Sequence, residues 1–270
     1  AVAYHEPGTA FEDDIWELYD LSNDFNELSD LSQPEALRLE KLKDLWWTEA
    51  ESNQVLPLDD RFGPRFAENA ERHRGGRTNY SFWPGMGHLP SDVAPDLRSR
   101  SYTISATVEL KSDFENGVLI AHGDATGGYS FYFEDGFLCH DLNIGGDHEI
   151  VKSAESLSIG RHDVSFQMKR TIETTDPNSR VYSQQNVISV KGEASLIVDG
   201  AVVGTLQTDR MFFLMVSWSG LDIGFDRGSP VGTYEAPFDF TAKLIHVTVD
   251  LEDDQELDYE GVGKTEMARE

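Results

Sequence analysis

Apolar and polar residues alternate with a period of two from residue 101 onward, and this pattern constrains the fold of the chain most strongly. Further strands are predicted at 118–121, 129–133, 137–142, 162–168, 186–190, 194–198, 212–216 and 243–251. Asp135-Gly136 and Asp199-Gly200 lie between such runs, and Asp-Gly supplies the positive φ angles of tight hairpins. Closely spaced strands without a helical period predict a mainly β fold, an antiparallel β-sandwich. Its first strand carries the inward residues Tyr102, Ile104, Ala106, Val108 and Leu110.

A helical segment precedes the predicted sandwich. Ser32-Gln33-Pro34-Glu35 matches a capping box, in which Ser32 binds the free amides of the first turn and Glu35 completes the pair. The Trp46-Trp47 pair is large enough that the helix must pack against a partner, either the later domain or sequence outside this chain. Three-to-four spacing predicts one buried helical face, made of Leu39, Leu42, Leu45, Trp46 and Ala50.

The remaining segments have weak periodicity. Residues 61–100 are rich in turn formers and are predicted to be an ordered connector, and residues 252–270 read as an acidic, frayed tail. The chain is thereby divided into 1–60 (helical), 61–100 (connector), 101–251 (sandwich) and 252–270 (tail). Pairing with neighbouring acids at an internal interface is favoured over anion binding for the connector arginines, which are Arg61, Arg65, Arg72, Arg74 and Arg77.

The charge of the chain excludes several classes of partner. It has 49 acidic and 22 basic residues, a formal net charge of -27, which repels nucleic-acid phosphates and anionic lipid surfaces. Its apolar runs, such as 211–216, are too short to span a bilayer. The single cysteine, Cys139, cannot form an internal disulfide, so the compartment stays open between cytoplasm, periplasm and secretion. We therefore expect neither nucleic acid nor membrane as a partner, and we interpret the acidity as a solvated surface, with cation binding as the alternative.

The sequence contains few patterns typical of catalysis or metal binding. Cys139 and His140 are adjacent on a predicted strand, so their side chains point to opposite faces and cannot form a nucleophile–base pair. The zinc motifs H-E-x-x-H and C-x-x-C are absent from the sequence. Three acidic loops could bind calcium through carboxylate and backbone oxygens, although close carboxylates also occur by chance in so acidic a chain; they are Asp124, Asp147–Glu149 and Asp222–Asp226.

Two patterns suggest carbohydrate chemistry. Glu252-Asp253-Asp254-Gln255-Glu256 fits the E-x-D-x-E strand of laminarinase-type sandwich glycosidases, but Asp253 and Gln255 stand where that family has apolar residues, so we interpret it as charged tail. Alternation places Tyr129, Phe131 and Phe133 on one strand face and Tyr132 on the other, so most aromatics should be core. The aromatic residues that could stack on sugars are Tyr80, Phe82, Trp83, Tyr129, Phe131, Tyr132, Trp218 and Tyr234.

A resemblance to a known family rests on two motifs in the N-terminal part. The segment Trp16-Glu17-Leu18-Tyr19-Asp20-Leu21, continuing to Asp24, Glu27 and Asp30-Leu31, resembles the W-E-L-Y-D-L-x-x-D-x-x-E segment of arylsulfatases. Val55-Leu56-Pro57-Leu58-Asp59-Asp60-Arg61 is similar to the V-L-P-L-D-D-R that follows it in bacterial members. The strand region resembles the C-terminal sandwich of long arylsulfatases and, more distantly, laminin-G and concanavalin-like modules, on Gly128-Tyr129-Ser130, Asp135-Gly136, Val198-Asp199-Gly200 and 221–231.

The resemblance implies sulfate ester hydrolysis by a formylglycine made from a C/S-x-P-x-R motif, assisted by Ca²⁺. That motif is absent here, since Cys139 is followed by neither the Pro nor the Arg, and Ser32-Gln33-Pro34-Glu35-Ala36 lacks the Arg. The Ca²⁺ ligands and the sulfate-binding Lys and His belong to the preceding domain in this family, so no residue of this chain inherits a catalytic, cofactor or metal role.

The resemblance therefore predicts the C-terminal portion of an arylsulfatase. The chain opens with Ala1-Val2-Ala3 and no Met, which fits a piece of a longer protein. Its expected partner is the sulfatase catalytic domain, with a glycan or small sulfate ester as substrate, and the isolated chain should not hydrolyse sulfate esters. The alternative is a stand-alone, lectin-like carbohydrate-binding sandwich.

Overall fold

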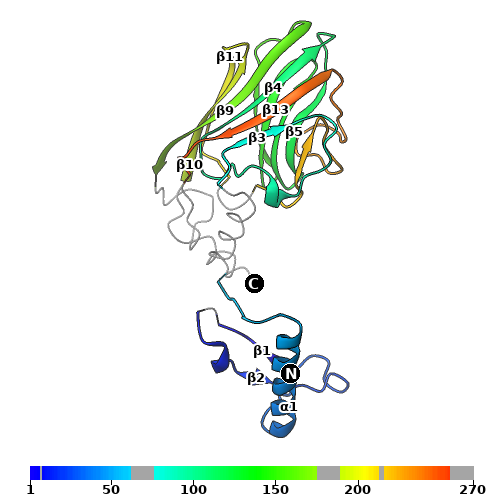
Figure 1. Ribbon diagram of the computed structural model, residues 1–270, viewed down its shortest axis with the longest axis vertical. Coiled ribbons are helices and arrows are strands. Elements are labelled where there is room, and N and C mark those ends of the chain that lie inside the picture. Colours follow the sequence, from blue (N-terminus) through cyan, green and yellow to red (C-terminus); the bar gives the residue numbers. More distant parts are fainter. Residues whose placement is uncertain (7, 62–75, 175–188, 213–215, 256–270) are drawn as a thin grey trace. The chain divides into compact units, whose positions relative to one another are not determined.

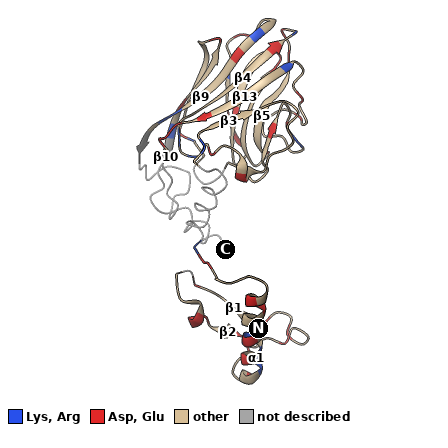
Figure 2. Ribbon diagram, viewed as in Figure 1, with Lys and Arg blue, Asp and Glu red and all other residues tan. Residues whose placement is uncertain are grey.

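The computed structural model describes residues 1–6, 8–61, 76–174, 189–212 and 216–255 (Figure 1). The chain divides into two compact units, Ala1–Phe66 and Ala67–Glu270. Acidic positions are present in both units, as the red segments of Figure 2 show. None of the helices in the described residues is long and apolar enough to cross a membrane.

The N-terminal unit is built on one helix. Strand β1 (Val2–Ala3) pairs antiparallel with β2 (Trp16–Glu17), a 3₁₀ turn η1 (Phe11–Asp13) lies between them in sequence, and α1 spans Ala36–Ser52. The apolar face of α1 is confirmed in part, because Leu39 and Ala50 are buried whereas Leu45 is 53% exposed. The Trp46 ring contacts Trp16 at 5.8 Å and Trp47 at 4.7 Å between ring centroids.

The predicted capping box at Ser32 is wrong. The helix begins at Ala36, and its N-cap residue Glu35 makes no side-chain cap. The Ser32 hydroxyl instead donates to Asp30 Oδ2 at 2.6 Å, and Asp30 Oδ1 accepts from the backbone N–H groups of Leu18 and Ser32. A carboxylate is a stronger acceptor than a hydroxyl, so Asp30 organises this turn and takes the Ser32 side chain away from the helix.

Two antiparallel sheets form the sandwich, which confirms the predicted fold class. The six-stranded sheet has the order β11-β10-β9-β4-β13-β3 and the five-stranded sheet the order β12-β5-β6-β7-β8. Figure 1 shows β9, β4 and β13 side by side in one layer. The bounds are β3 Asn79–Phe82, β4 Tyr102–Leu110, β5 Gly117–Asp124, β6 Gly127–Glu134, β7 Phe137–Ile144, β8 Asp147–Lys152, β9 Gly160–Thr174, β10 Ser189–Val198, β11 Ala201–Thr208, β12 Leu221–Ile223 and β13 Lys243–Leu251, with a 3₁₀ turn η2 at Ser91–Val93.

Several strand predictions differ from the structure. The two runs predicted at 186–190 and 194–198 belong to one strand, β10, as far as the described residues extend, and the described residues of 212–216 are not in a strand. Strands β8, β11 and β12 were not predicted. Strand β3 lies within the predicted connector 61–100 and pairs with β13, so the described part of that segment contributes to the sandwich.

Alternation fills the space between the sheets with apolar side chains. The main core contains Tyr129, Phe131 and Phe133 from one face of β6, as predicted, together with Phe166 from β9. Tyr132 points to the other face of the five-stranded sheet and joins a second core with Val118, Ala121, Cys139, Val231 and Tyr234. The segment 224–240, called the covering segment below, thus packs Val231, Tyr234 and Phe238 against the outer face of this sheet.

Contacts at the sheet edges join the two layers. Leu89 forms an isolated antiparallel bridge with Leu221 of the edge strand β12. At the edge formed by β8 and β11, the backbone N–H of Ala154, just after β8, donates to the Val203 carbonyl of β11 at 3.0 Å. The start of the predicted tail is also held, because the Asp254 carboxylate accepts from the N–H and hydroxyl of Ser101. Residues 252–255 are therefore part of the sandwich, and 256–270 lie outside the described residues.

Candidate functional site

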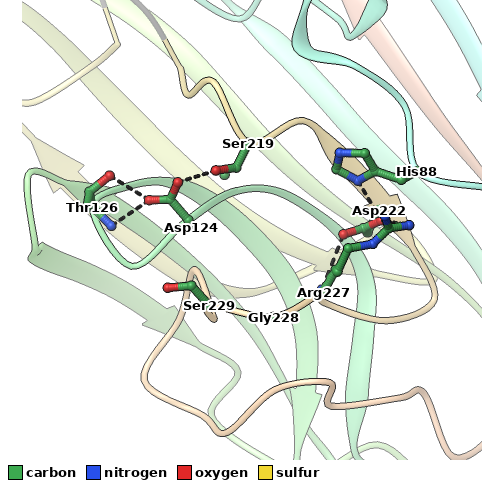
Figure 3. Close-up of a pocket in the computed structure, with 9 residues that line it drawn as sticks. His88, Asp124, Thr126, Ser219, Asp222, Arg227, Gly228 and Ser229 are labelled. Atoms are coloured by element: carbon green, nitrogen blue, oxygen red, sulfur yellow. Dashed lines mark hydrogen bonds and ion pairs between the residues drawn. The ribbon is translucent and has the colours of Figure 1, made fainter.

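A pocket of about 480 Å³ opens beside the end of β5 (Figure 3). It is formed by the β5–β6 turn, the start of β12, and the loops around residues 88, 219 and 228. Three stretches that are distant in sequence thus supply its walls, at residue 88, at 123–126 and at 219–229. Its lining residues are His88, Gly123, Asp124, Thr126, Ser219, Asp222, Arg227, Gly228 and Ser229.

Glycines shape the turn that forms one wall of the pocket. Gly123 has φ +130°, and a Cβ there would lie 2.2 Å from the Gly127 carbonyl oxygen. Gly128 has φ +146°, and a Cβ there would lie 2.1 Å from the His122 carbonyl oxygen. Backbone approach this close is open only to glycine, so Asp124 and Thr126 are presented on a tightly constrained turn.

Asp124 is held in the pocket by hydrogen bonds from two neighbouring residues. Its Oδ1 accepts from the Thr126 N–H at 2.8 Å, and its Oδ2 accepts from the Ser219 hydroxyl. Burial raises the pKa of Asp124, but the hydrogen bonds from Ser219 and Thr126 outweigh this and leave the pKa below its ordinary value. Asp124 is therefore a fixed negative charge at neutral pH.

Asp222 organises the opposite wall. Its side chain is 6% exposed, with His88 Nδ1 at 3.0 Å from Oδ1 and the Arg227 N–H donating to Oδ2 at 3.2 Å. The Arg227 guanidinium lies 3.8 Å from Oδ1, and its side chain is 56% exposed. One buried carboxylate thus orients an imidazole and an arginine toward the same pocket (Figure 3).

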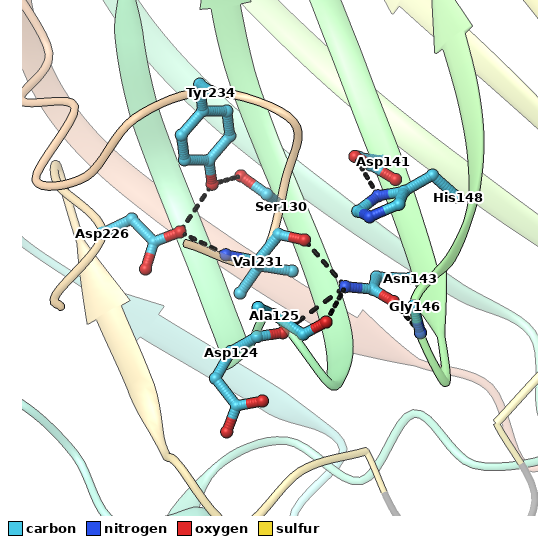
Figure 4. Close-up of polar contacts among 10 residues, drawn as sticks. All are labelled: Asp124, Ala125, Ser130, Asp141, Asn143, Gly146, His148, Asp226, Val231 and Tyr234. Atoms are coloured by element: carbon cyan, nitrogen blue, oxygen red, sulfur yellow. Dashed lines mark hydrogen bonds and ion pairs between the residues drawn. The ribbon is translucent and has the colours of Figure 1, made fainter. Parts of the chain in front are cut away.

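Asn143 of β7 connects the β5–β6 turn to the covering segment 224–240 (Figure 4). Its buried Nδ2 lies 2.9 Å from the Val231 carbonyl and 3.3 Å from the Ala125 carbonyl, and its Oδ1 accepts from the Gly146 N–H. A second link is the Ala125 N–H, which donates to Ser229 Oγ at 3.3 Å. These bonds fix the spacing between two walls of the pocket.

Behind the pocket, Asp226 anchors the covering segment (Figure 4). Its Oδ2 accepts from the Val231 N–H at 2.9 Å and from the Tyr234 hydroxyl at 2.7 Å. The Tyr234 oxygen lies 2.6 Å from Ser130 Oγ, and because the phenol has one proton to donate, it accepts from Ser130. Burial raises the pKa of Asp226, and the negative charges of Asp222 and Asp124 raise it further.

The structure brings two of the predicted calcium residues, Asp124 and Asp222, into one pocket. It does not gather the others there, because Asp226 is committed to Tyr234 and Asp147 pairs with Arg210 at 3.1 Å. Across the described residues, no group of three or more His, Cys, Asp or Glu side chains is arranged to hold a metal ion. Of the other lining residues, Arg227, Gly228 and Ser229 lie in the segment 221–231 that carries the laminin-G resemblance, whereas His88, Gly123, Thr126 and Ser219 were not singled out from the sequence.

The other candidate residues occupy structural positions. Cys139 lies in the second core, and burial raises the pKa of its thiol to about 12, so it is not a reactive nucleophile. His140 faces the main core, as the alternation predicts, stacked on Phe166 with 3.4 Å between ring centroids. The Glu252 N–H bonds to the Ser101 carbonyl, and Glu256 lies outside the described residues, so the glycosidase-like pattern forms no described carboxylate pair.

The connector arginines differ in their partners, and the candidate sugar-stacking aromatics differ in their exposure. Arg61 pairs with Asp59 at 2.9 Å, Arg77 lies over the Tyr80 ring, and Arg65, Arg72 and Arg74 lie outside the described residues. Among the aromatics, Trp83 is 56% exposed and Trp218 is 69% exposed. Trp218 directly precedes Ser219, so it is an exposed aromatic ring adjoining the pocket in sequence. The predicted sugar-stacking residues that are buried are Tyr80, Phe82, Tyr129, Phe131, Tyr132 and Tyr234.

Comparisons with known proteins match this chain at the level of structure. No family model matches the sequence, and no curated protein matches it. Among solved structures, the CBM40 of the Ruminococcus gnavus IT-sialidase bound to α2,3-sialyllactose aligns over 70% of this chain and 96% of its own, with 14% identity and a TM-score of 0.40. Domains LG4-5 of the mouse laminin α1 chain align over 68% of this chain and 41% of theirs, with 11% identity and a TM-score of 0.40. At such low identity and TM-score these structures carry no functional assignment, and the antiparallel sandwich is established by the strand topology itself.

Proposed function

We propose that the β-sandwich is a carbohydrate-binding module and that the pocket at Asp124 and Asp222 is its binding site. The main observation in support is a pocket of about 480 Å³ whose polar groups are already held in place by the fold. Binding pockets for small ligands are commonly on the order of 300–1,000 Å³ and orient the ligand with a few fixed polar groups. Because a sugar presents hydroxyls that both donate and accept, it matches the mixed lining of this pocket.

The lining offers both kinds of hydrogen-bonding partner. Asp124 supplies acceptor oxygens, Arg227 supplies donors, and Thr126 and Ser229 supply hydroxyls. Trp218 is exposed and directly precedes the lining residue Ser219, so it offers an aromatic face beside the pocket on which the apolar face of a sugar ring can stack. The combination of fixed polar groups and an exposed ring supports sugar recognition in preference to binding of a purely apolar ligand.

Truncating the exposed ring is the direct test. We expect the full chain to bind at least one oligosaccharide on a printed glycan array, and Trp218→Ala to weaken that binding about tenfold or more, as loss of an aromatic contact with the ligand does. Isothermal titration with the oligosaccharide found on the array measures the change in Kd.

Phe114→Ala provides the matched control. Phe114 is 72% exposed and lies in the turn before β5, at the opposite end of that strand from Asp124. This variant should keep the affinity of the unaltered chain. If no oligosaccharide is bound, the assignment of the pocket as a carbohydrate site is wrong, and if both variants bind as the unaltered chain does, the proposed contact with Trp218 is wrong.

We propose for the N-terminal unit a second role, as the closing segment of a sulfatase-type hydrolase domain that the sandwich accompanies. This proposal starts from the arylsulfatase-like motifs of residues 16–31 and 55–61. Its supporting structural observation is that apolar side chains within or beside them are exposed, including Phe25 at 85%, Leu28 at 81% and Leu37 at 84%. Exposed apolar side chains of this number favour a protein partner, for which the sulfatase catalytic domain is our candidate.

Sequencing the gene upstream of the Ala1 codon tests this second role. We expect the reading frame to continue and to encode a C/S-x-P-x-R motif. The encoded longer protein should then hydrolyse p-nitrophenyl sulfate in the presence of Ca²⁺, whereas the 270-residue chain should not. A stop codon directly upstream, or hydrolysis by the 270-residue chain itself, would contradict the proposal.

A further inference from the structure

We infer that the pocket selects sugars without anionic groups, and prefers those that carry an ammonium group, over sulfated or carboxylated sugars. This inference rests on the proposed carbohydrate-binding function and specifies its ligand class. It follows from the charges that line the pocket and from how each of them is already paired.

The pocket is negative where a ligand would sit. Its lining has two carboxylates, Asp124 and Asp222, against one guanidinium, that of Arg227, and one imidazole, that of His88. The guanidinium does not stand alone, because it lies 3.8 Å from Asp222 Oδ1. Within the described residues Asp124 pairs with no cation, and its partners are neutral groups of Thr126, Ser219 and the Gly127 backbone.

Asp124 still has acceptor capacity for a ligand. A carboxylate offers about four lone-pair sites, and Thr126 takes up to two of those on Oδ1 through its N–H and hydroxyl, while Ser219 binds Oδ2. Figure 3 shows the carboxylate held between these two residues. A ligand ammonium or hydroxyl can therefore donate to Asp124, whereas a sulfate or carboxylate has no proton to offer and meets a like charge.

The surroundings of the pocket reinforce this preference. Asp226 belongs to the segment 224–240, and burial, followed by the negative charges of Asp222 and Asp124, raises its pKa against the hydrogen bonds from Val231 and Tyr234 that lower it. The chain as a whole carries a net charge of -27. Such a field repels an approaching polyanion and attracts a cation.

A matched set of oligosaccharides separates charge from shape. The probes are a glucosamine tetramer with free amines, its N-acetylated form and its N-sulfated form, which share a backbone and differ in the charge on nitrogen. Titration calorimetry uses the full chain in about 0.15 M salt, where interactions between exposed charges more than about 8 Å apart are largely screened. We expect the free-amine tetramer to bind about tenfold more tightly than the N-acetylated form, and the N-sulfated form to bind at least about tenfold more weakly than the N-acetylated form.

Two Asp→Asn variants locate the effect. Asp124→Asn removes the pocket charge and should reduce the preference for the free amine about fivefold or more. Asp113→Asn makes the same charge change on an exposed residue before β5, at the far end of that strand, and should leave the preference intact. Equal losses in both variants would attribute the preference to the overall field and overturn its assignment to the pocket.

The outcomes distinguish this inference from the function on which it rests. Tightest binding of the N-sulfated tetramer, abolished by Arg227→Gln, would overturn the charge preference while carbohydrate binding stands. Binding of other sugars on the array but of none of the three tetramers would also overturn the inference alone. Absence of binding to every oligosaccharide tested would remove the carbohydrate-binding function itself.

Discussion

Asn143→Ala is expected to destabilise the chain by about 3 kcal/mol and to weaken oligosaccharide binding about tenfold or more. The side chain is fully buried, and it satisfies the Val231 and Ala125 carbonyls and the Gly146 N–H. Each buried polar group left without a partner costs about 1–3 kcal/mol. The loss of binding follows because these bonds set the distance between two walls of the pocket.

Asn116→Ala is the control for this prediction. Its side chain also makes hydrogen bonds within a turn, donating to the Phe114 carbonyl and accepting from the Asp135 N–H, but at a more exposed place. We expect this variant to lose about 1 kcal/mol and to keep its affinity for the oligosaccharide. Urea unfolding and titration calorimetry measure both quantities. Equal losses of stability in the two variants would mean that Asn143 is no more than an ordinary turn residue.

His140→Phe is expected to remove a large part of the acid sensitivity of the fold. Burial lowers the pKa of His140 to about 3, and its Nε2 has no hydrogen-bond partner in the described part of the chain. The unfolded chain binds a proton at this histidine below about pH 6.5, while the folded chain does so only near pH 3. The titration of His140 therefore costs no unfolding free energy above about pH 6.5, and it lowers the unfolding free energy as the pH falls from there toward 3.

The expected size follows from the same two pKa values. Between about pH 7 and pH 4.5, the unaltered chain should lose roughly 2–3 kcal/mol more unfolding free energy than His140→Phe does. Urea unfolding across this range provides the measurement. Phe166→Leu, a change in the ring that His140 stacks on, should instead lower stability by a similar amount at every pH. Parallel pH profiles for the unaltered chain and His140→Phe would show that the imidazole is not buried in its neutral form.

The fold was predictable where side-chain alternation was strong. Strand β4 has the predicted bounds, and the hairpin residues Asp135-Gly136 and Asp199-Gly200 have the positive φ angles expected of them. Prediction of strands failed where apolar and polar residues do not alternate clearly. Most residues of β11 are exposed or half-buried, β12 has three residues, and β3 lies among turn formers, so their pairing depends on neighbouring strands.

The candidate site was predictable only in part. Acidic loops pointed to Asp124 and Asp222, but their separation of almost a hundred residues gave no sign that they line one pocket. His88 lies in the segment predicted as a connector, and the Leu89–Leu221 bridge is what brings it to Asp222. The prediction that Ser32 caps the helix failed for a local reason. The nearby Asp30 carboxylate accepts from the hydroxyl that the capping motif had assigned to the helix.

The joined edges of the sandwich limit how other molecules can attach to it. An open edge strand would offer unpaired backbone groups on which an extended peptide, or another copy, could add as a further strand. Here β12 is flanked by Leu89, and β11 is tied to the segment after β8 through Val203 and Ala154. The edge strand β3 has four residues, too few for a long added strand. At these three edges, attachment of another molecule is thereby directed to loops and side chains, and the sandwich gains protection there from edge-to-edge aggregation.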